Sequence, residues 1–176
     1  PVNININSIN DTPVILENNS LQLDDIYEDC DITTTDSNQY NCNDDGFNSG
    51  QSIQSIIDLL GVSNITDYDS EEEDIIDCVE NYDIFGIAIT EVDDTNGAWY
   101  YKESNSWQLI DNSQISGDDL VLTLSDIAMI KFNPNPEYIG NSTLDFVVWD
   151  QSHGNNTGDI VAISSYVDDS PFSANE

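Results

Sequence analysis

The chain has 176 residues, of which 38% are hydrophobic, enough for one domain with a sizeable core. It carries 2 Lys or Arg residues against 35 Asp or Glu residues, a formal net charge of -33. This charge excludes nucleic acid and anionic membrane surfaces as partners, because phosphate groups are bound through basic side chains. Insertion into a membrane is not expected either, because no stretch approaches the ~20 apolar residues of a membrane span.

The first third of the chain alternates short extended segments with polar loops. The sequence VNINI at 2–6 places apolar and polar residues with period two, which predicts a half-buried strand. Extended structure is expected again at 14–16 and 21–27, and residues 28–50 form a polar loop too long for a simple connection. The acidic stretch at 67–77 is expected to be a solvated run of charge, with cation binding as the alternative.

One short helix is predicted in the sequence QSIQSIIDLL at 51–60. Its apolar residues recur at helical spacing, and Gly61 follows as a stop signal. The predicted apolar face consists of Ile53, Ile56, Ile57 and Leu60.

From Ile84 onward, strands dominate. The predicted segments are IFGIAIT, GAWYYK, SWQLI, LVLTL, IAMIKF, LDFVVWD and DIVAISSYV, with Asp, Asn, Gly and Pro frequent between them. Short strands separated by turns every ~8–12 residues are typical of a β-sandwich, so the fold class is predicted to be all-β.

The segment GAWYYKESNSWQL is predicted to form a hairpin that turns at ESNS. Trp99 and Tyr101 would then share one face of the strand, and Tyr100 and Lys102 the other. Trp99 and Trp107 are expected to meet across the hairpin as a cross-strand aromatic pair. The aromatic rings are therefore interpreted as core, and an exposed platform for stacking sugars is the alternative.

The cysteines and sequons indicate an extracellular chain. Cys30 and Cys42 bracket a polar loop and are expected to close it as a disulfide, which leaves Cys78 odd; reduced thiols are the alternative. No signal segment is present, which is expected of a mature or cut product. Glycan is expected on some of the Asn-x-Ser/Thr sequons if the source is eukaryotic. These sequons are at Asn18, Asn64, Asn141 and Asn155.

Several segments between about Asn10 and Phe172 point to a family. They are NDTPV, YED, NSGQSIQSII, GIAITEVDDTNGAWYY, SWQLI, LVLTL and IKFNPNPEYIGNSTLDFVVWDQSHG. In this order they resemble the cadherin-like repeats of giant, mostly bacterial, extracellular adhesins. The resemblance implies an Ig-like sandwich that is stiffened by calcium, strung in tandem and without catalytic activity. The loop at 28–50 departs from it, being longer than the family pattern.

The chain also differs from these repeats in the order of its ends. In the repeats, a stretch like SPFSA leads into a last strand like VNINI and then into the NDTP linker, whereas here SPFSANE stands last and the strand first. The expected organisation is an arm at 1–9 and a single cadherin-like domain at 10–176, with 28–50 as an insertion.

The arm is expected to act as a donor strand. Val2, Ile4 and Ile6 would insert into the next copy of the chain, as in donor-strand complementation of pilins. Such head-to-tail contacts do not close on themselves and give a filament. Two alternatives stay open. In the first, the chain is one repeat of a tandem adhesin, and the arm is the last strand of the preceding repeat. In the second, the arm folds back on its own domain.

Calcium is the cofactor that the charge and the resemblance suggest, the alternative being a solvated acidic coat. Asn10 and Asp11 resemble inter-repeat ligands, and other oxygens are expected to join them because Ca²⁺ takes six to eight. The candidate partners are Glu28, Asp29, Asp93, Asp94, Asp150 and Asp168 with its neighbour Asp169.

Other functions are less well supported by the sequence. With 35 acids, a carboxylate pair at a glycosidase-like spacing arises by accident, and His153 has no nucleophile that the sequence places beside it. We therefore expect no enzymatic activity. A carbohydrate-binding module is the more serious alternative, since sandwiches often present tryptophans to glycans.

Overall fold

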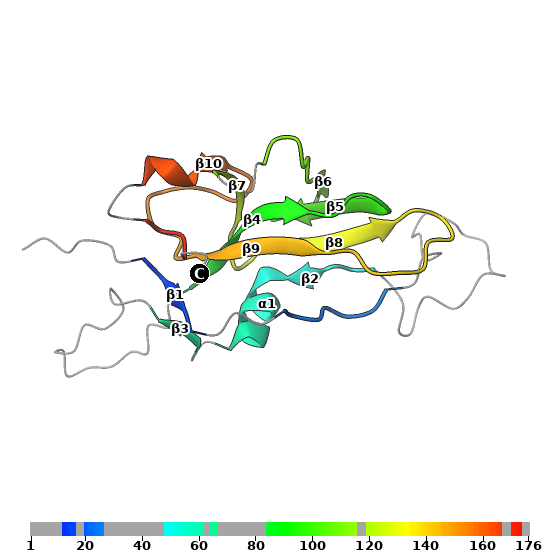
Figure 1. Ribbon diagram of the computed structural model, residues 1–176, viewed down its shortest axis with the longest axis horizontal. Coiled ribbons are helices and arrows are strands. Elements are labelled where there is room, and N and C mark those ends of the chain that lie inside the picture. The colour runs from blue at the N-terminus through cyan, green and yellow to red at the C-terminus, as the bar shows by residue number, and fades with distance from the viewer. Residues whose placement is uncertain are drawn as a thin grey trace, which may run out of the picture.

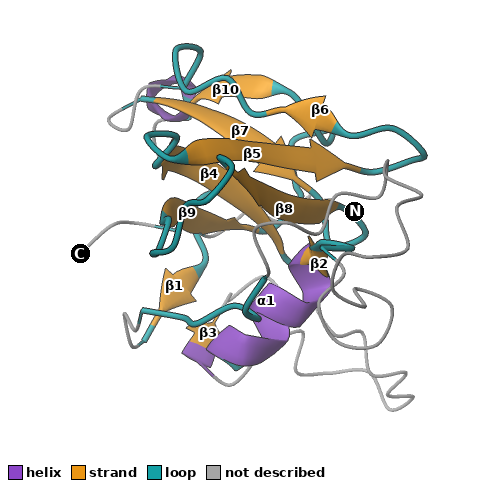
Figure 2. Ribbon diagram, turned by 90° about the vertical axis from the view of Figure 1, so that its right-hand side faces the viewer, coloured by secondary structure: helices purple, strands orange, loops and turns teal. Residues whose placement is uncertain are grey.

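The computed structural model describes residues 12–16, 20–26, 48–61, 64–66, 84–115, 119–166 and 170–173. These residues form mostly β-strands in two four-stranded antiparallel sheets, with one short α-helix (Figures 1 and 2). The prediction of an all-β sandwich is confirmed at this level.

The first sheet has the strand order β10-β7-β4-β9 and the second the order β2-β8-β5-β6. The strands of the first sheet are β10 (Ile160–Ala162), β7 (Leu120–Leu124), β4 (Gly86–Val92) and β9 (Leu144–Trp149). Those of the second are β2 (Gln51–Ser52), β8 (Met129–Pro134), β5 (Gly97–Lys102) and β6 (Gln108–Leu109). A separate pair joins β1 (Val14–Ile15) to β3 (Ile65–Thr66).

The main core lies between the sheets and follows the period-two alternation of their strands. Ile87 and Ile89 of β4 and Leu122 of β7 face this core, whereas Ala88 and Val121 belong to a second, smaller cluster on the other face of the first sheet. The central strands of the first sheet are thus buried on both faces, and their sequences are nearly continuous apolar runs rather than strict alternations.

The helix α1 (Ile53–Leu60) forms where the sequence predicts it. Ser52 caps its N-terminus by accepting a hydrogen bond from the Ser55 N–H at 3.2 Å. Gly61 ends it with a φ of 82°, a conformation that glycine adopts without a steric penalty. Three isoleucines at helical spacing are buried against the core, which anchors α1 beside β2 at one side of the sandwich (Figure 2).

The hairpin of β5 and β6 is confirmed, but its predicted tryptophan pair is wrong. The ladder pairs Tyr100 with Leu109 and Tyr101 with Gln108, and the Ile110 N–H donates to the Trp99 carbonyl, so Ile110 and not Trp107 lies opposite Trp99. Trp99 is 5% exposed and packs against Phe132 of β8 with ring centroids 5.2 Å apart.

Trp107 takes part in a different cluster. The ammonium groups of Lys102 and Lys131 lie 4.5 and 4.7 Å from the centroid of its ring. These two lysines are the only Lys or Arg residues of the chain. Their positive charges are attracted to the electron-rich face of the Trp107 indole, which explains why Trp107 packs against them and not against Trp99.

Two further segments differ from the predictions. Residues 20–26 belong to no strand, although Leu21 and Leu23 pack against the main core. The last predicted strand ends early, because Ile163–Ser165 forms a 3₁₀ turn. There the Ser165 hydroxyl donates to the Ala162 carbonyl at 2.6 Å and the Ser164 N–H donates to the Asp119 carboxylate at 2.9 Å. These side-chain bonds compete with a continued ladder.

Candidate functional site

The strand β9 forms the longest edge of the two sheets. Its six residues pair with β4 on one side, whereas the other edge strands have two or three residues. On the second side, the Ser173 N–H donates to the Val148 carbonyl at 2.9 Å and the Asp150 N–H donates to the Pro171 carbonyl at 3.0 Å. The segment 170–173 therefore covers only the end of β9 that is nearer to Asp150.

At Ser173, the last described residue of this segment, the pairing includes a side chain. The Val148 N–H donates to the Ser173 hydroxyl at 3.0 Å, in place of the backbone carbonyl that a continued antiparallel ladder would use. Because alternate residues of a strand point to the same edge, the backbone groups of Leu144 and Phe146 face away from β4. No described residue forms a hydrogen bond with these outward-facing groups. We call these groups the free edge of β9.

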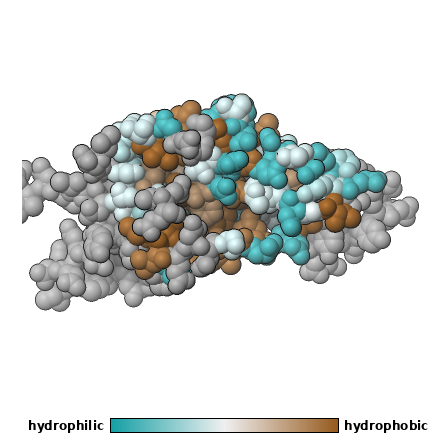
Figure 3. Space-filling view, viewed as in Figure 1, coloured by the Kyte–Doolittle hydropathy of each residue, from teal (hydrophilic) through white to brown (hydrophobic). Residues whose placement is uncertain are grey.

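The free edge borders apolar surface. Leu144 and Phe146 are half-buried and pack against the main core, while Asp145 between them is exposed. Hydrophobic side chains gather over β9 on the face shown in Figure 3. An unpaired edge beside apolar side chains is a template for the addition of another strand.

The predicted calcium ligands do not come together among the described residues. Asp93 and Asp94 follow β4, and the Asp93 N–H donates to the Thr143 carbonyl before β9. Asp150 follows β9 at the opposite end of the same ladder, about 20 Å away at the usual rise of a strand.

Asp93 and Asp150 each accept a hydrogen bond from a backbone N–H two residues further along the chain. Asp93 accepts a hydrogen bond from the Thr95 N–H at 3.0 Å, and the side chain and backbone of Thr95 lower the pKa of this carboxyl. Asp150 accepts one from the Ser152 N–H at 2.7 Å. In the described ranges, no group of three or more His, Cys, Asp or Glu side chains has an arrangement that could hold a metal ion.

Other predicted residues lie outside the described parts of the chain. They are Val2, Ile4 and Ile6 of the arm, the candidate ligands Asn10, Asp11, Glu28, Asp29 and Asp168, the cysteines Cys30, Cys42 and Cys78, and the sequon residue Asn18.

The three described sequons differ in their accessibility. Asn141 is exposed. The Asn64 amide donates to the Leu60 carbonyl at the end of α1, at 2.7 Å, and the Asn155 amide donates to the Tyr166 hydroxyl at 2.9 Å. Asn141 is therefore the described sequon best placed to carry a glycan.

A polar hollow of about 280 Å³ lies at one end of the sandwich, and no motif in the sequence predicts it. Three loops form it together with the end of β9: one follows β5, one joins β7 to β8, and one joins β9 to β10. We call it the end hollow. Its lining residues are Glu103, Ser125, Asp126, Ile127, Trp149, Gln151, Asn155, Asn156 and Thr157.

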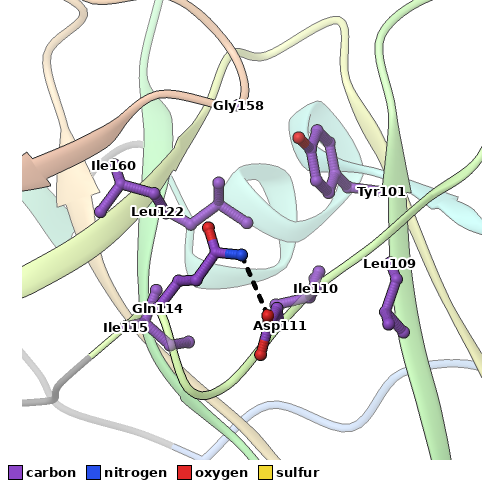
Figure 4. Close-up of a pocket in the computed structure, with 9 residues that line it drawn as sticks. All are labelled: Tyr101, Leu109, Ile110, Asp111, Gln114, Ile115, Leu122, Gly158 and Ile160. Atoms are coloured by element: carbon purple, nitrogen blue, oxygen red, sulfur yellow. Dashed lines mark hydrogen bonds between the residues drawn. The ribbon is translucent and has the colours of Figure 1, made fainter.

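A smaller pocket of about 70 Å³ opens between β6 and β10 (Figure 4). Burial raises the pKa of the Tyr101 phenol at its rim, and the nearby charge of Asp159 adds to this effect. On one side of the pocket, the Gln114 amide donates to the Asp111 carboxylate of the same turn at 2.9 Å. The pocket is far below the ~300 Å³ of an ordinary ligand site, so we assign it no ligand.

Comparisons with known proteins give no counterpart for this chain: no family model, no curated protein and no solved structure matches it. The resemblance to cadherin-like repeats therefore stays a prediction. None of the helices in the described ranges is long and apolar enough to span a membrane.

Proposed function

We propose that the chain is a non-enzymatic extracellular structural subunit with an Ig-like, cadherin-like sandwich. Copies of it assemble head-to-tail into a filament, in which residues 2–6 of one copy add a strand to the free edge of β9 in the next. The observation that supports the proposal best is this edge, where no described residue hydrogen-bonds to the outward-facing backbone groups of Leu144 and Phe146, whose side chains are half-buried and apolar.

The arm has the pattern that this edge requires. A strand added beyond Ser173 would lie opposite Leu144 and Phe146 and would hydrogen-bond to their outward-facing backbone groups. With period-two alternation, Val2, Ile4 and Ile6 would cover the apolar side of the edge while the intervening asparagines face solvent. Burial of each large aliphatic side chain is worth about 1.5–3 kcal/mol before the cost of association.

The test uses two charge-matched variants of the full chain. Ile4→Asp with Ile6→Asp places two carboxylates on the inserted face of the arm, and we expect it to leave monomers. The control, Asn3→Asp with Asn5→Asp, adds the same charge on the other face and should still assemble. Particle size by light scattering and the presence of fibres by electron microscopy distinguish the two. Filaments that persist in the isoleucine variant refute the proposal.

The alternatives give different results in the same experiment. If the arm belongs to a preceding repeat of a tandem adhesin, neither variant changes the particle size. If the arm folds back on its own domain, the wild-type chain is already monomeric, and the isoleucine variant loses thermal stability.

Calcium belongs to the proposal as a stiffener of the joint between copies. The net charge of -33 supports it, because so many carboxylates repel one another unless cations neutralise them. Since Asp93 and Asp94 lie far from Asp150, a shared site would depend on Asn10 and Asp11 and on the other acids outside the described residues. Ca²⁺ accepts such carboxylate and amide oxygens as ligands.

A further inference from the structure

We propose that consecutive copies of the chain also meet through apolar side chains at the joint between them. Ile139 of the acceptor copy, which holds the arm, docks against Val14 and Leu16 of the donor copy, which supplies it. We call Val14 and Leu16 the β1 corner. This contact rests on the proposed function, because the inserted arm is what brings the two surfaces together.

The direction of the added strand determines which end of β9 faces the donor copy. Every strand pair among the described residues is antiparallel, and Phe172 of the segment 170–173 also pairs with β9 in the antiparallel sense. An arm that continues this line beyond Ser173 places its residue 6 at the Leu144 end of β9. The donor chain therefore leaves the acceptor copy beside residues 135–143, the loop that joins β8 to β9.

The arm is attached to its own domain a few residues later. Pro13 is buried and β1 begins at Val14, so residues 7–12 span the distance between the inserted strand and the donor domain. A chain of this length reaches at most about 25 Å when it is fully extended. The β1 corner of the donor copy therefore lies close to the loop 135–143 of the acceptor copy.

These two surfaces lie at different ends of one copy. In Figure 1, β1 and β3 lie toward one end of the long axis, and the loop 135–143, drawn in yellow, lies toward the other. They are thus too far apart to meet within a copy, but they face each other between copies that are arranged head-to-tail. Such a contact does not close on itself, as a filament requires.

The β1 corner is an exposed apolar surface on a fixed strand. Val14 is 41% exposed and Leu16 is 59% exposed, while Ile15 between them packs against the main core. Because successive side chains of a strand alternate, Val14 and Leu16 point to the same side, away from this core. The Leu16 N–H donates to the Asn64 carbonyl at 2.8 Å, which holds the strand beside β3.

The loop 135–143 presents Ile139 on a fixed backbone. Ile139 is 88% exposed, more than any other large hydrophobic residue in the described ranges. On one side of it the Tyr138 N–H donates to the Asn135 carbonyl at 3.1 Å, and on the other the Tyr138 hydroxyl donates to the Asn141 carbonyl at 2.8 Å. A side chain on a fixed loop loses less conformational entropy when it binds. Single exposed isoleucines are common, so it is the place of Ile139 beside the exit of the arm that assigns it this partner.

Light scattering over a concentration series tests the contact with the full chain. We expect Ile139→Asp to raise the concentration at which half of the chain is assembled roughly tenfold or more, because it removes a large aliphatic side chain from the joint. The control is Leu109→Asp, which adds the same charge at a position that is 56% exposed. Leu109 lies on β6, at the side of the sandwich away from β9 (Figure 2), and this variant should assemble as the wild type does.

A pair of opposite charges tests whether Ile139 and Leu16 meet. We expect Leu16→Glu alone to weaken assembly and Ile139→Lys with Leu16→Glu to restore it, because the two charges attract each other across the joint. Leu109→Lys with Leu16→Glu has the same net charge and should not restore assembly. If the two double variants assemble alike, Ile139 does not meet the β1 corner, and the inference is overturned.

The variant with Ile4→Asp and Ile6→Asp separates this inference from the proposed function. If that variant stays monomeric while Ile139→Asp assembles as the wild type does, strand addition stands and the apolar joint is refuted. If the wild-type chain is monomeric, or if the arm variant still forms filaments, the proposed function fails and the joint fails with it.

Discussion

The replacement of Ser142 by alanine tests how the two sheets are tied together. Ser142 precedes β9 of the first sheet, and its hydroxyl accepts a hydrogen bond from the Trp99 indole N–H of the second sheet at 2.9 Å. The same hydroxyl donates to the Asp93 carbonyl at 2.8 Å. Ser142→Ala therefore leaves the N–H of a tryptophan that is 5% exposed without its partner.

An unsatisfied buried donor costs about 1–3 kcal/mol, and we expect Ser142→Ala to lower the free energy of unfolding by about 2 kcal/mol. Urea unfolding monitored by tryptophan fluorescence measures this change. In a double-mutant cycle with Trp99→Phe, Ser142→Ala should lower the free energy of unfolding by less, because phenylalanine has no N–H that could be left unpaired. Ser106→Ala, at an exposed turn position, is the control and should stay within about 0.5 kcal/mol. A Ser142→Ala loss no larger than that of the control would contradict the reasoning.

Three other predictions follow from the cation cluster, a buried phenol and the net charge. Trp107→Ala should lower the free energy of unfolding by about 1–2 kcal/mol, because it removes the contacts with Lys102 and Lys131, each worth about 0.5–1 kcal/mol; unchanged urea unfolding would refute the cluster. Burial raises the pKa of Tyr101 in the folded state above the 10.0 of the free side chain, so its contribution to stability is complete below pH 10 and is lost as the pH rises through the folded pKa. Above pH 10, the melting temperature should fall less steeply with pH in Tyr101→Phe than in the wild type. An equal fall in both proteins would argue against this linkage. Removal of Ca²⁺ with a chelator is expected to lower the melting temperature or to loosen filaments, because uncompensated carboxylates would repel one another. If neither the melting temperature nor the filaments change, calcium has no part in the proposal.

The parts of the fold that the sequence predicts are those set by local rules. Ser52 and Gly61 delimit α1 because a capping hydroxyl and a left-handed glycine act over one helical turn. The strands from Ile84 onward were predictable because period two and the turn residues recur with little interruption. The tryptophan pairing was not, because the register of a short hairpin decides whether Trp107 lies opposite Trp99 or beside the lysines, and a pattern of residue types leaves that register open.

In the candidate sites, too, the sequence predicts local features and leaves open those that depend on how distant segments pair. The alternation of the arm is visible in the sequence, whereas the free edge of β9 depends on how far the described segment 170–173 pairs along that strand, which a pattern of residue types leaves open. The end hollow draws Glu103 and Asp126 from two separate loops and Trp149 from the end of β9. In a chain with 35 acids, no local signal marks two particular carboxylates as neighbours.

Residue-resolved hydrogen exchange across a concentration series tests strand addition at β9 most directly. We predict that the amides of Leu144 and Phe146 become protected as the wild-type chain assembles and remain exchangeable in the variant with Ile4→Asp and Ile6→Asp. Asp145 and Val147 face β4 and should be protected in both. Assembly that leaves the Leu144 and Phe146 amides unprotected, or equal protection in the isoleucine variant, would contradict the addition of the arm to this edge.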